Sequence, residues 1–227
     1  MNDKRIIQIT QDGSHTIAIP SKNIAYHSIH GALQESMHIF MKCGLRHCIN
    51  SLPQNKPVYV FEMGLGTGLN ALLAWKEATL LRQKIIYCAV ELYPLTTAEA
   101  NSLNYDSFME GHNMHLSAIH NAAWNTFTVL NEYFSFEKTN IDIQAFHTTK
   151  KFHIIFFDAF DPNAQPELWT EVVFKKMFGM LHTHGILITY CSKGAVQRAM
   201  KAAGFTIEKL KGPPGKREII RAKKTIH

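Results

Sequence analysis

The sequence lacks several features that mark particular classes of protein. No uninterrupted apolar run approaches the roughly 20 residues that a membrane-spanning helix needs, and the opening MNDKRIIQIT has no apolar core of a signal peptide. The four cysteines form no CxxC pair, and the 13 histidines show no HExxH spacing. We therefore expect no membrane association, no metal site and no disulfides, and we place the chain in the cytoplasm.

Charged residues are also sparse, at 19% of the chain, whereas 46% of the residues are hydrophobic and 11% are aromatic. This balance supplies enough apolar side chains to offset the conformational entropy lost on folding, which excludes wholesale disorder. A length of 227 residues fits one α/β domain with a modest extension.

The net charge of +6 is distributed unevenly. Residues 193–227 contain ten Lys or Arg and two acids, a local charge of +8, which leaves −2 for the rest of the chain. A cationic end on a nearly neutral body favours a polyanionic partner, because neutralising phosphates releases condensed counterions. Nucleic acid is the leading candidate, and a solubilising basic tail is the alternative.

The first 56 residues are predicted to form a small extension. Residues 6–10 and 15–19 alternate apolar and polar side chains around a turn with Gly13, which predicts a β-hairpin. Apolar residues then recur at helical spacing from about Gly31. Pro53 and Pro57 interrupt regular structure, so we divide the chain into residues 1–56 and a main domain, 57–227.

The main domain alternates compact apolar runs with helical stretches. The expected strands are 58–61, 84–90, 140–146, 152–157 and 185–190, and the expected helices are 69–82, 121–134, 166–181 and 194–203. This alternation predicts a parallel sheet with helices on both faces. Residues 205–210 and 218–222 are joined without a helix, so we expect them to pair as an antiparallel hairpin at the sheet edge.

A glycine-rich turn follows the strand at 58–61. Its three alternate glycines, Gly64, Gly66 and Gly68, permit a sharp bend and close approach to a ligand at the start of a helix. The spacing is GxGxG rather than the GxGxxG of dinucleotide sites. Glu62 stands two residues before the first glycine, where a carboxylate suits a cationic cofactor such as S-adenosylmethionine.

The next two expected strands supply further candidate cofactor ligands. Glu91 ends the run 84–90 beside the glycine turn, where ribose hydroxyls would be held. Asp142, which we place on the third strand, is a candidate for the adenine amino group, and Asn140 and Gln144 compete with it.

Several motifs together resemble the MnmC-like methyltransferase family. They are the segments at 26–36, 62–68, 156–162, 165–170 and 212–218, which read YHSIHGALQES, EMGLGTG, FFDAFDP, QPELWT and GPPGKRE. The resemblance implies a class I methyltransferase fold, a Rossmann-like and mostly parallel seven-stranded sheet with a terminal antiparallel hairpin. It also implies methylation, by S-adenosylmethionine, of the aminomethyl group of a modified wobble uridine in tRNA. Bifunctional members carry an additional FAD-dependent half, for which this chain has no room before His227.

The methyl acceptor in such a reaction is an amine, which is mostly protonated near neutral pH and must present a free lone pair to the methyl group. Asp158, at the end of the fourth strand, is our candidate to accept an N–H hydrogen bond and orient that lone pair. Asp161 would take this role in place of Asp158 if the turn after the strand directs the Asp161 carboxylate inward.

The residues around this turn are candidates for substrate contacts. Phe160 and Trp169 have aromatic faces that suit an unstacked base, and the alternative for Trp169 is a core position, which is the more common one for such a residue. Lys216 and Arg217 lie on the basic terminal hairpin, where they would bind phosphates of the anticodon stem-loop. We interpret Glu35 as part of either a cover over the crevice or a solvated helix face, and Cys191 as a packing residue.

Three rival functions stay open on sequence alone. The first is an NAD- or FAD-linked oxidoreductase, which the GxGxG spacing disfavours. The second is a non-catalytic RNA-binding module that retains a cofactor pocket. The third is a methyltransferase of the same fold that acts on another amine or on a protein.

Overall fold

The computed structural model describes residues 4–53, 56–109 and 111–225. It begins with a small antiparallel sheet of β1 (Ile6–Ile9), β2 (His15–Ile19) and β3 (Ile24–Ala25). Ile6 pairs with Ala18 and Ile9 with His15, so the predicted N-terminal hairpin is confirmed, and β3 is an addition to it. The Asp12 carboxylate closes its turn by accepting from the Ser14 amide at 3.0 Å.

One helical segment follows this sheet, as the apolar spacing predicts. It consists of α1 (Ala32–Ser36), a π-helical stretch (Met37–Arg46) and α2 (His47–Ser51). The π-helical stretch lies close against the central sheet at Gly44, where an added Cβ would stand 3.1 Å from Ile188 and 3.2 Å from Ile154. The segment shares a hydrophobic core with the main sheet, and the division at residues 56 and 57 stays a prediction.

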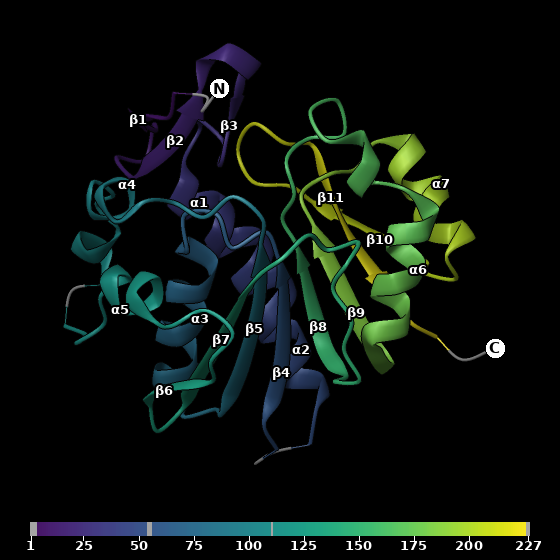
Figure 1. The fold of residues 1–227 in the computed structure, drawn as a ribbon. Helices are drawn as coiled ribbons and strands as arrows, with labels where there is room; N and C mark the ends of the chain where they lie inside the picture. Colours follow the sequence, from purple (N-terminus) through teal and green to yellow (C-terminus); the bar gives the residue numbers. More distant parts are fainter. Residues whose placement is uncertain (1–3, 54–55, 110, 226–227) are drawn as a thin grey trace.

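The central sheet has eight strands in the described part of the chain, in the order β10-β11-β9-β8-β4-β5-β7-β6 (Figure 1). The strands are β4 (Val58–Met63), β5 (Ile85–Glu91), β6 (Thr128–Asn131), β7 (Phe134–Asn140), β8 (Phe152–Phe157), β9 (Leu181–Thr189), β10 (Thr206–Lys211) and β11 (Glu218–Lys223). The five central strands are mutually parallel, and β6, β10 and β11 pair antiparallel at the two edges. The expected mostly parallel sheet with a terminal edge hairpin is confirmed.

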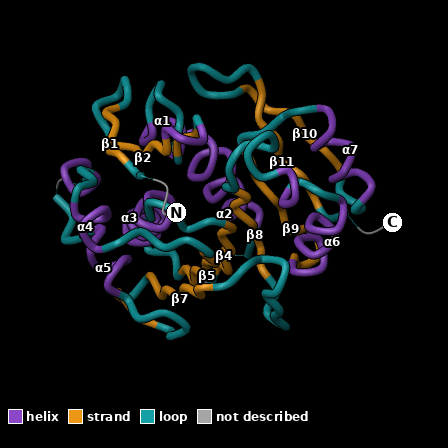
Figure 2. The backbone as a smooth tube through the Cα atoms, turned by 45° about the horizontal axis from the view of Figure 1, so that its top comes forward, coloured by secondary structure: helices purple, strands orange, loops and turns teal. Residues whose placement is uncertain are grey.

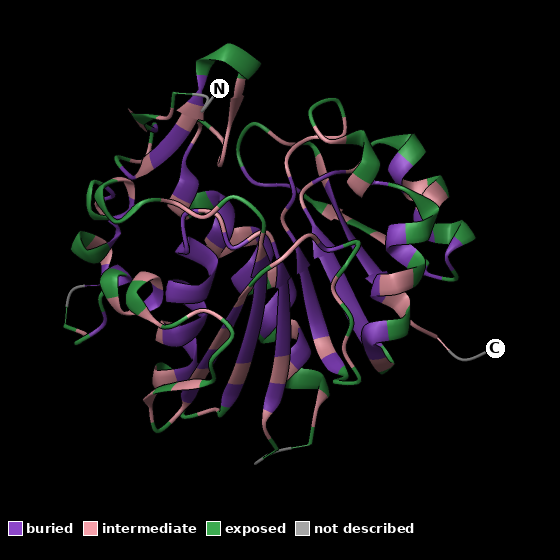
Figure 3. Cartoon of the chain, viewed as in Figure 1, coloured by how far each residue is buried: buried purple, intermediate pink, exposed green. Residues whose placement is uncertain are grey.

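Helices cover both faces of this sheet (Figure 2). They are α3 (Leu69–Leu80), α4 (Thr97–Asn101), α5 (Leu116–Asn121), α6 (Glu171–Met180) and α7 (Gly194–Ala202). Side chains of β4 alternate between the two cores, so that Val60 packs with α3 and Phe61 packs with α6 and α7. Figure 3 shows the strands buried between helices whose outer surfaces are exposed.

The region between α5 and β8 differs from the sequence prediction. The helix expected at 121–134 was wrong, because β6 and β7 form a hairpin there, with Val129 opposite Ser135. Asn131 closes the turn by accepting from the Tyr133 amide at 2.9 Å. This hairpin adds an eighth strand to the seven that the family resemblance implied.

The strand expected at 140–146 was also wrong, because the third parallel strand is β7 and ends at Asn140. The buried Lys138 interrupts the apolar pattern of β7, so the sequence of this strand does not look like that of a buried strand. Beyond it the chain turns, and the amides of Ala145 and Phe146 both donate to the Asp142 carbonyl.

Three structural findings concern features that the composition made improbable. No helix among the described residues is long and apolar enough to cross a bilayer. In the same residues no cluster of three or more His, Cys, Asp or Glu is arranged to hold a metal ion. The four cysteines are unpaired.

Candidate active site

The glycine turn joins the carboxyl end of β4 to the first residue of α3. Gly64 and Gly66 have φ angles of +87° and +51°, a region that side-chain-bearing residues rarely adopt. An added Cβ on Gly66 would lie 2.9 Å from the Tyr26 ring, and one on Gly64 would lie 3.0 Å from the Asp158 carbonyl oxygen. Gly68 is the N-cap residue of α3 and has no side chain that could accept a hydrogen bond from the first amides of the helix. The backbone amides at the start of α3 therefore donate no hydrogen bond to a capping side chain.

Glu91 lies beside this turn, at the carboxyl end of β5. One carboxylate oxygen accepts from the Gly66 amide at 2.9 Å, and the other accepts from the Tyr93 amide at 2.7 Å. Since a carboxylate oxygen has two lone pairs, each retains acceptor capacity for a ligand hydroxyl. The contact fixes the carboxylate of β5 directly on the glycine turn that follows β4.

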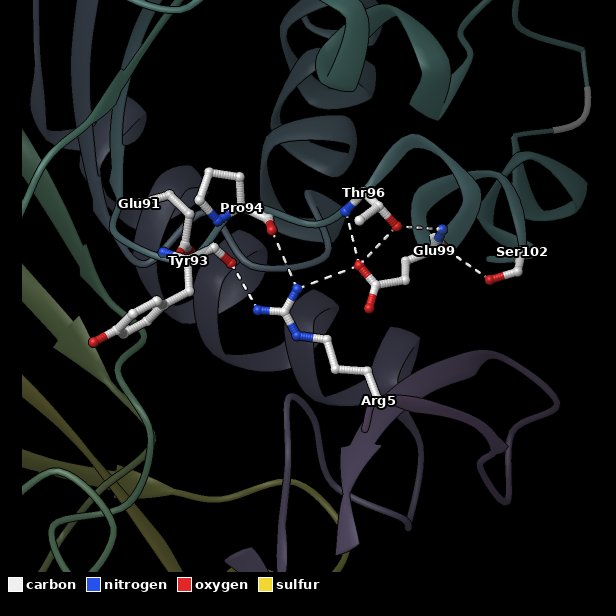
Figure 4. A network of polar contacts seen from close by, with 7 residues as sticks. All are labelled: Arg5, Glu91, Tyr93, Pro94, Thr96, Glu99 and Ser102. Atoms are coloured by element: carbon white, nitrogen blue, oxygen red, sulfur yellow. Dashed lines mark hydrogen bonds and ion pairs between the residues drawn. The ribbon is translucent and has the colours of Figure 1, made fainter. Parts of the chain in front are cut away.

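The loop after Glu91 is held by the N-terminal segment (Figure 4). Arg5 donates to the carbonyl oxygens of Tyr93 and Pro94 and pairs with Glu99 at 3.3 Å. Glu99 in turn completes a capping box with Thr96 at the start of α4. The N-terminal extension therefore fixes the loop that directly follows Glu91, the candidate ribose ligand.

Glu62, Asn70 and Asp158 form a connected group at the base of the turn. The Asn70 side-chain amide donates to Glu62 Oε1 at 3.0 Å and to Asp158 Oδ2 at 2.8 Å. Glu62 is completely buried, and its Oε2 makes no hydrogen bond of normal geometry within the described part of the chain, although the buried Tyr87 hydroxyl lies near the carboxyl group and lowers its pKa. Burial, together with the neighbouring Asp158 charge, raises the pKa of Glu62 well above its usual range. An unpartnered buried carboxylate oxygen fits a site built to receive a cationic or hydrogen-bonding ligand.

Asp158 directly follows β8, as the sequence predicts, and its amide donates to the Met63 carbonyl of β4. Burial raises the pKa of its carboxyl group to about 7, and the nearby Glu35 charge acts in the same direction. The hydrogen bond from Asn70 and the Lys216 charge oppose this rise. A carboxyl group with this pKa exchanges a proton near neutral pH, which suits a general base.

A second group of side chains faces Asp158 from other elements. Glu35 of α1 is 8% exposed, and it accepts from the Ser28 amide at 2.8 Å. Its other oxygen pairs with the Lys216 ammonium at 3.1 Å. That ammonium also lies 4.7 Å from the centre of the Tyr190 ring. The loop joining β10 and β11, which carries Lys216, reaches the same end of the molecule as the N-terminal sheet (Figure 1).

Sequence reasoning does not find two members of this site, Asn70 and Tyr190, and it leaves the role of Glu35 open. Asn70 stands two residues after the glycine turn, and no motif marks it. Tyr190 directly follows β9, at the same sheet edge as Asp158, and that position was a usable signal. The sequence allows two interpretations of Glu35, and its burial excludes the solvated helix face.

Asp142 lies in the turn after β7 and not on a strand, which corrects its predicted placement. Its carboxylate accepts from the Gln144 amide at 2.7 Å. The turn still follows the strand next to β5, because the Ile141 amide donates to the Glu91 carbonyl. Its role toward a cofactor stays a prediction.

The two aromatic candidates differ in accessibility. Phe160 is half-buried, with its ring edge-on to Tyr26 at 4.9 Å. Trp169 is only 6% exposed and packs on Phe157 and Phe174, as a core side chain does, and its stacking on a base stays a prediction. Its indole donates to the Phe160 carbonyl at 2.8 Å and fixes that residue's backbone.

The basic terminal segment is partly neutralised within the fold. Arg217 is exposed, as expected of a phosphate contact. Lys216 departs from its expected surface role because its ammonium points to Glu35 and Tyr190. Four other cations of the segment pair with acids, and these are Lys193, Lys209, Arg221 and Lys223. Asp161, the substitute for Asp158, is the partner of Lys193 at 2.7 Å and does not join the Asn70 network.

Comparisons with known proteins show which family and which fold the chain resembles. Residues 114–225 match the family described as S-adenosyl-L-methionine-dependent methyltransferase. A tRNA 5-methylaminomethyl-2-thiouridine biosynthesis bifunctional protein MnmC from Burkholderia thailandensis is 27% identical over 92% of this chain and 33% of its own length. The chain thus spans about a third of the length of the curated relatives it matches.

Solved structures support the same fold. MNMC2 from Aquifex aeolicus superposes with a TM-score of 0.79 at 21% identity, over 100% of this chain and 72% of that one. An S-adenosylmethionine-bound amino pentose methyltransferase, CalS10 from Micromonospora echinaspora, has a TM-score of 0.51 at 12% identity. It is matched over 86% of this chain and 92% of its own.

Proposed function

Since this chain is an S-adenosylmethionine-dependent methyltransferase related to the bifunctional protein MnmC, we propose that its acceptor is an amine on tRNA. The acceptor is the aminomethyl group of 5-aminomethyluridine, or of its 2-thio form, at the wobble position. The product is the corresponding 5-methylaminomethyl nucleoside. The observation that carries this proposal is the Asp158 carboxyl, hydrogen-bonded through Asn70 to the buried Glu62 beside the glycine turn.

The cofactor would be held by residues at the carboxyl ends of β4 and β5 and in the turn after β7. Glu62 would offer its buried carboxyl oxygen Oε2 to the cationic end of the cofactor, whose charge would favour the ionised form of that group, and the backbone of the turn, at Gly64, Gly66 and Gly68, allows close approach. Glu91 accepts the ribose hydroxyls, and Asp142 accepts the adenine amino group. When bound, S-adenosylmethionine supplies an electrophilic methyl group on a positively charged sulfur.

Asp158 prepares the acceptor amine. An alkylammonium that enters the site must lose a proton before its nitrogen has a lone pair. Asp158, with a pKa near 7, takes that proton or passes it to water. The carboxyl oxygen then holds an N–H of the neutral amine and directs its lone pair toward the methyl donor.

Contacts to tRNA surround this position. Phe160 stacks on the displaced wobble base, while Trp169 holds the Phe160 backbone from below. The exposed Arg217 contacts a phosphate of the anticodon stem-loop. A tRNA acceptor places the enzyme in the cytoplasm.

The test is methyl transfer to defined tRNAs. Purified protein is incubated with methyl-labelled S-adenosylmethionine and tRNA that carries 5-aminomethyl-2-thiouridine, and the digested nucleosides are analysed by mass spectrometry. We expect the label in 5-methylaminomethyl-2-thiouridine only, and none when the wobble base is an unmodified uridine. Label in another nucleoside, or none in any, refutes the proposed acceptor. A parallel titration with NADH tests the oxidoreductase rival, which tight NADH binding would favour.

A further inference from the structure

The Lys216 ammonium occupies a position that suits a ligand. It lies between the Glu35 carboxylate, at 3.1 Å, and the face of the Tyr190 ring, at 4.7 Å from its centre. It is close enough to Asp158 to act on that carboxyl electrostatically. An ammonium flanked by a carboxylate and an aromatic face is a typical recognition arrangement for an alkylammonium ligand.

The groups that surround this ammonium are each fixed by a partner other than Lys216. Glu35 Oε2 accepts from the Ser28 amide, and the Tyr190 hydroxyl donates to the Ala159 carbonyl at 2.8 Å. Asp158 is held by Asn70. These contacts preserve the arrangement when Lys216 leaves, so the site does not depend on its present occupant.

Lys216 itself is attached through a flexible stem on the loop between β10 and β11. Its ammonium makes no other ion pair in the described chain, and its side chain is 26% exposed, so a path to solvent exists. Asp161, the other nearby acid, is already paired with Lys193 at 2.7 Å. Movement of one side chain therefore empties the site.

We propose that Glu35, Tyr190 and Asp158 bind the ammonium of the methyl acceptor, and that Lys216 fills this position until the acceptor displaces it. The inference rests on the proposed function, because an aminomethyl group and a lysine side chain end in the same primary ammonium. Exchange of one cation for another keeps the buried carboxylates neutralised throughout. A wobble uridine without the amine cannot replace Lys216, so the exchange selects the amine-bearing tRNA.

Kinetics with a Lys216→Met variant test the exchange. Removing the internal competitor should lower the KM for amine-bearing tRNA by about three- to tenfold, as expected if the site is open for roughly a tenth to a third of the time. The kcat should stay within about twofold. Lys175→Met is the matched control, because Lys175 pairs with Glu171 on the exposed face of α6, and its KM should not change. Glu35→Gln should raise the KM.

The contrary outcomes are distinct. A KM that rises in Lys216→Met identifies a phosphate contact, and a lower kcat with unchanged KM identifies a role in proton transfer. An unchanged KM and kcat shows that Lys216 does not compete. Each of these results overturns the proposal.

A binding experiment without tRNA separates this inference from the proposed function. In protein labelled with ¹⁵N-lysine, the Lys216 ammonium resonance is assigned by its absence from Lys216→Met. We expect ethylammonium chloride to shift it saturably, sodium chloride at equal concentration to leave it in place, and Glu35→Gln to abolish the response. If ethylammonium acts but no tRNA is methylated, the ammonium site stands and the tRNA proposal falls. If tRNA is methylated but ethylammonium acts no differently from sodium, the ammonium site falls.

Discussion

Replacing Asp158 with Asn should stabilise the ligand-free protein above pH 7 while it removes most methyl transfer. Burial and the Glu35 charge raise the pKa of Asp158 to about 7 in the folded chain, from 3.8 when unperturbed. The folded state therefore holds a proton that the unfolded state has released. The contribution of the protonated Asp158 carboxyl group to the free energy of unfolding is complete below about pH 4 and is lost as the pH rises through about 7.

The magnitude follows from the pKa difference of about 3, which corresponds to roughly 4 kcal/mol over the whole titration. Between pH 5 and pH 8 the wild type should lose about 3 kcal/mol of unfolding free energy from this group. The side-chain amide that the substitution introduces stays neutral over this range. Loss of the Asp158 charge also relieves the repulsion that raises the pKa of Glu62. This second effect, like the first, stabilises the variant relative to wild type as the pH rises.

The assay is urea unfolding of wild type and Asp158→Asn, without cofactor, at intervals from pH 5 to pH 8. We expect the unfolding free energy of the variant relative to wild type to increase by about 3 kcal/mol across this range. Asp161→Asn is the matched control, because the pKa of Asp161 lies below 3.8 and its contribution to the unfolding free energy should be constant from pH 5 to pH 8. Partial burial opposes the effect there, but the hydrogen bond from Lys193 lowers the pKa of Asp161, so its contribution is present at high pH. A pH-independent difference for Asp158→Asn, or one that falls with pH, would refute the reasoning.

Four further predictions concern the turn, the cofactor and the substrate. Gly66→Ala should cost about 1–3 kcal/mol of unfolding free energy and abolish S-adenosylmethionine binding, because its φ is +51° and the new methyl group would lie 2.9 Å from Tyr26; unchanged urea unfolding and unchanged calorimetric binding would contradict this. Glu91→Gln should weaken S-adenosylmethionine binding about tenfold or more, since a hydrogen bond to a charged group is worth about 1.5–3 kcal/mol; calorimetry that shows wild-type affinity would exclude Glu91 as a ribose ligand. Trp169→Ala should lower the unfolding free energy by about 3–5 kcal/mol, because the indole is a core side chain; normal stability with a selective rise in KM for tRNA would support the base-stacking role. Arg217→Ala should raise the KM for tRNA and reduce its dependence on log salt by about one; an unchanged salt dependence would exclude a phosphate contact.

The parts of the fold that the sequence predicts correctly have a strong local pattern. β4 and β8 are apolar nearly throughout, and the glycine turn identifies where β4 meets α3. The terminal hairpin follows from two strand-like runs that have no helix between them. These features depend on neighbouring residues alone, so periodicity and turn chemistry are sufficient.

The sequence analysis misses β7 because one of its residues, Lys138, is a buried cation whose partners lie outside the strand. Lys138 is buried, and its ammonium donates to the Ile119 carbonyl at 3.0 Å and lies 4.4 Å from the centre of the Trp124 ring. Carbonyl oxygens at the end of α5 thus accept hydrogen bonds from the ammonium of Lys138, which lies inside strand β7. No local pattern reveals those partners.

Some site residues can be predicted from local sequence, and others depend on the tertiary fold. Asp158, Glu62 and Glu91 lie at strand ends, where parallel topology brings them to one edge. The inward direction of Lys216 depends instead on Glu35, which arrives from α1 at the other end of the chain. Composition places Lys216 in a basic surface segment, and only the tertiary fold shows its buried partner.

In the proposed site the methyl donor lies between the glycine turn and the carboxylates of Glu62 and Glu91, with its reactive carbon facing Asp158. A crystal structure of the complex with S-adenosylhomocysteine would show whether the cofactor binds there. We expect ribose hydroxyls on Glu91 and the ligand sulfur on the Asp158 side of the turn. A ligand bound elsewhere, or protein side chains filling that space in the complex, would contradict this placement.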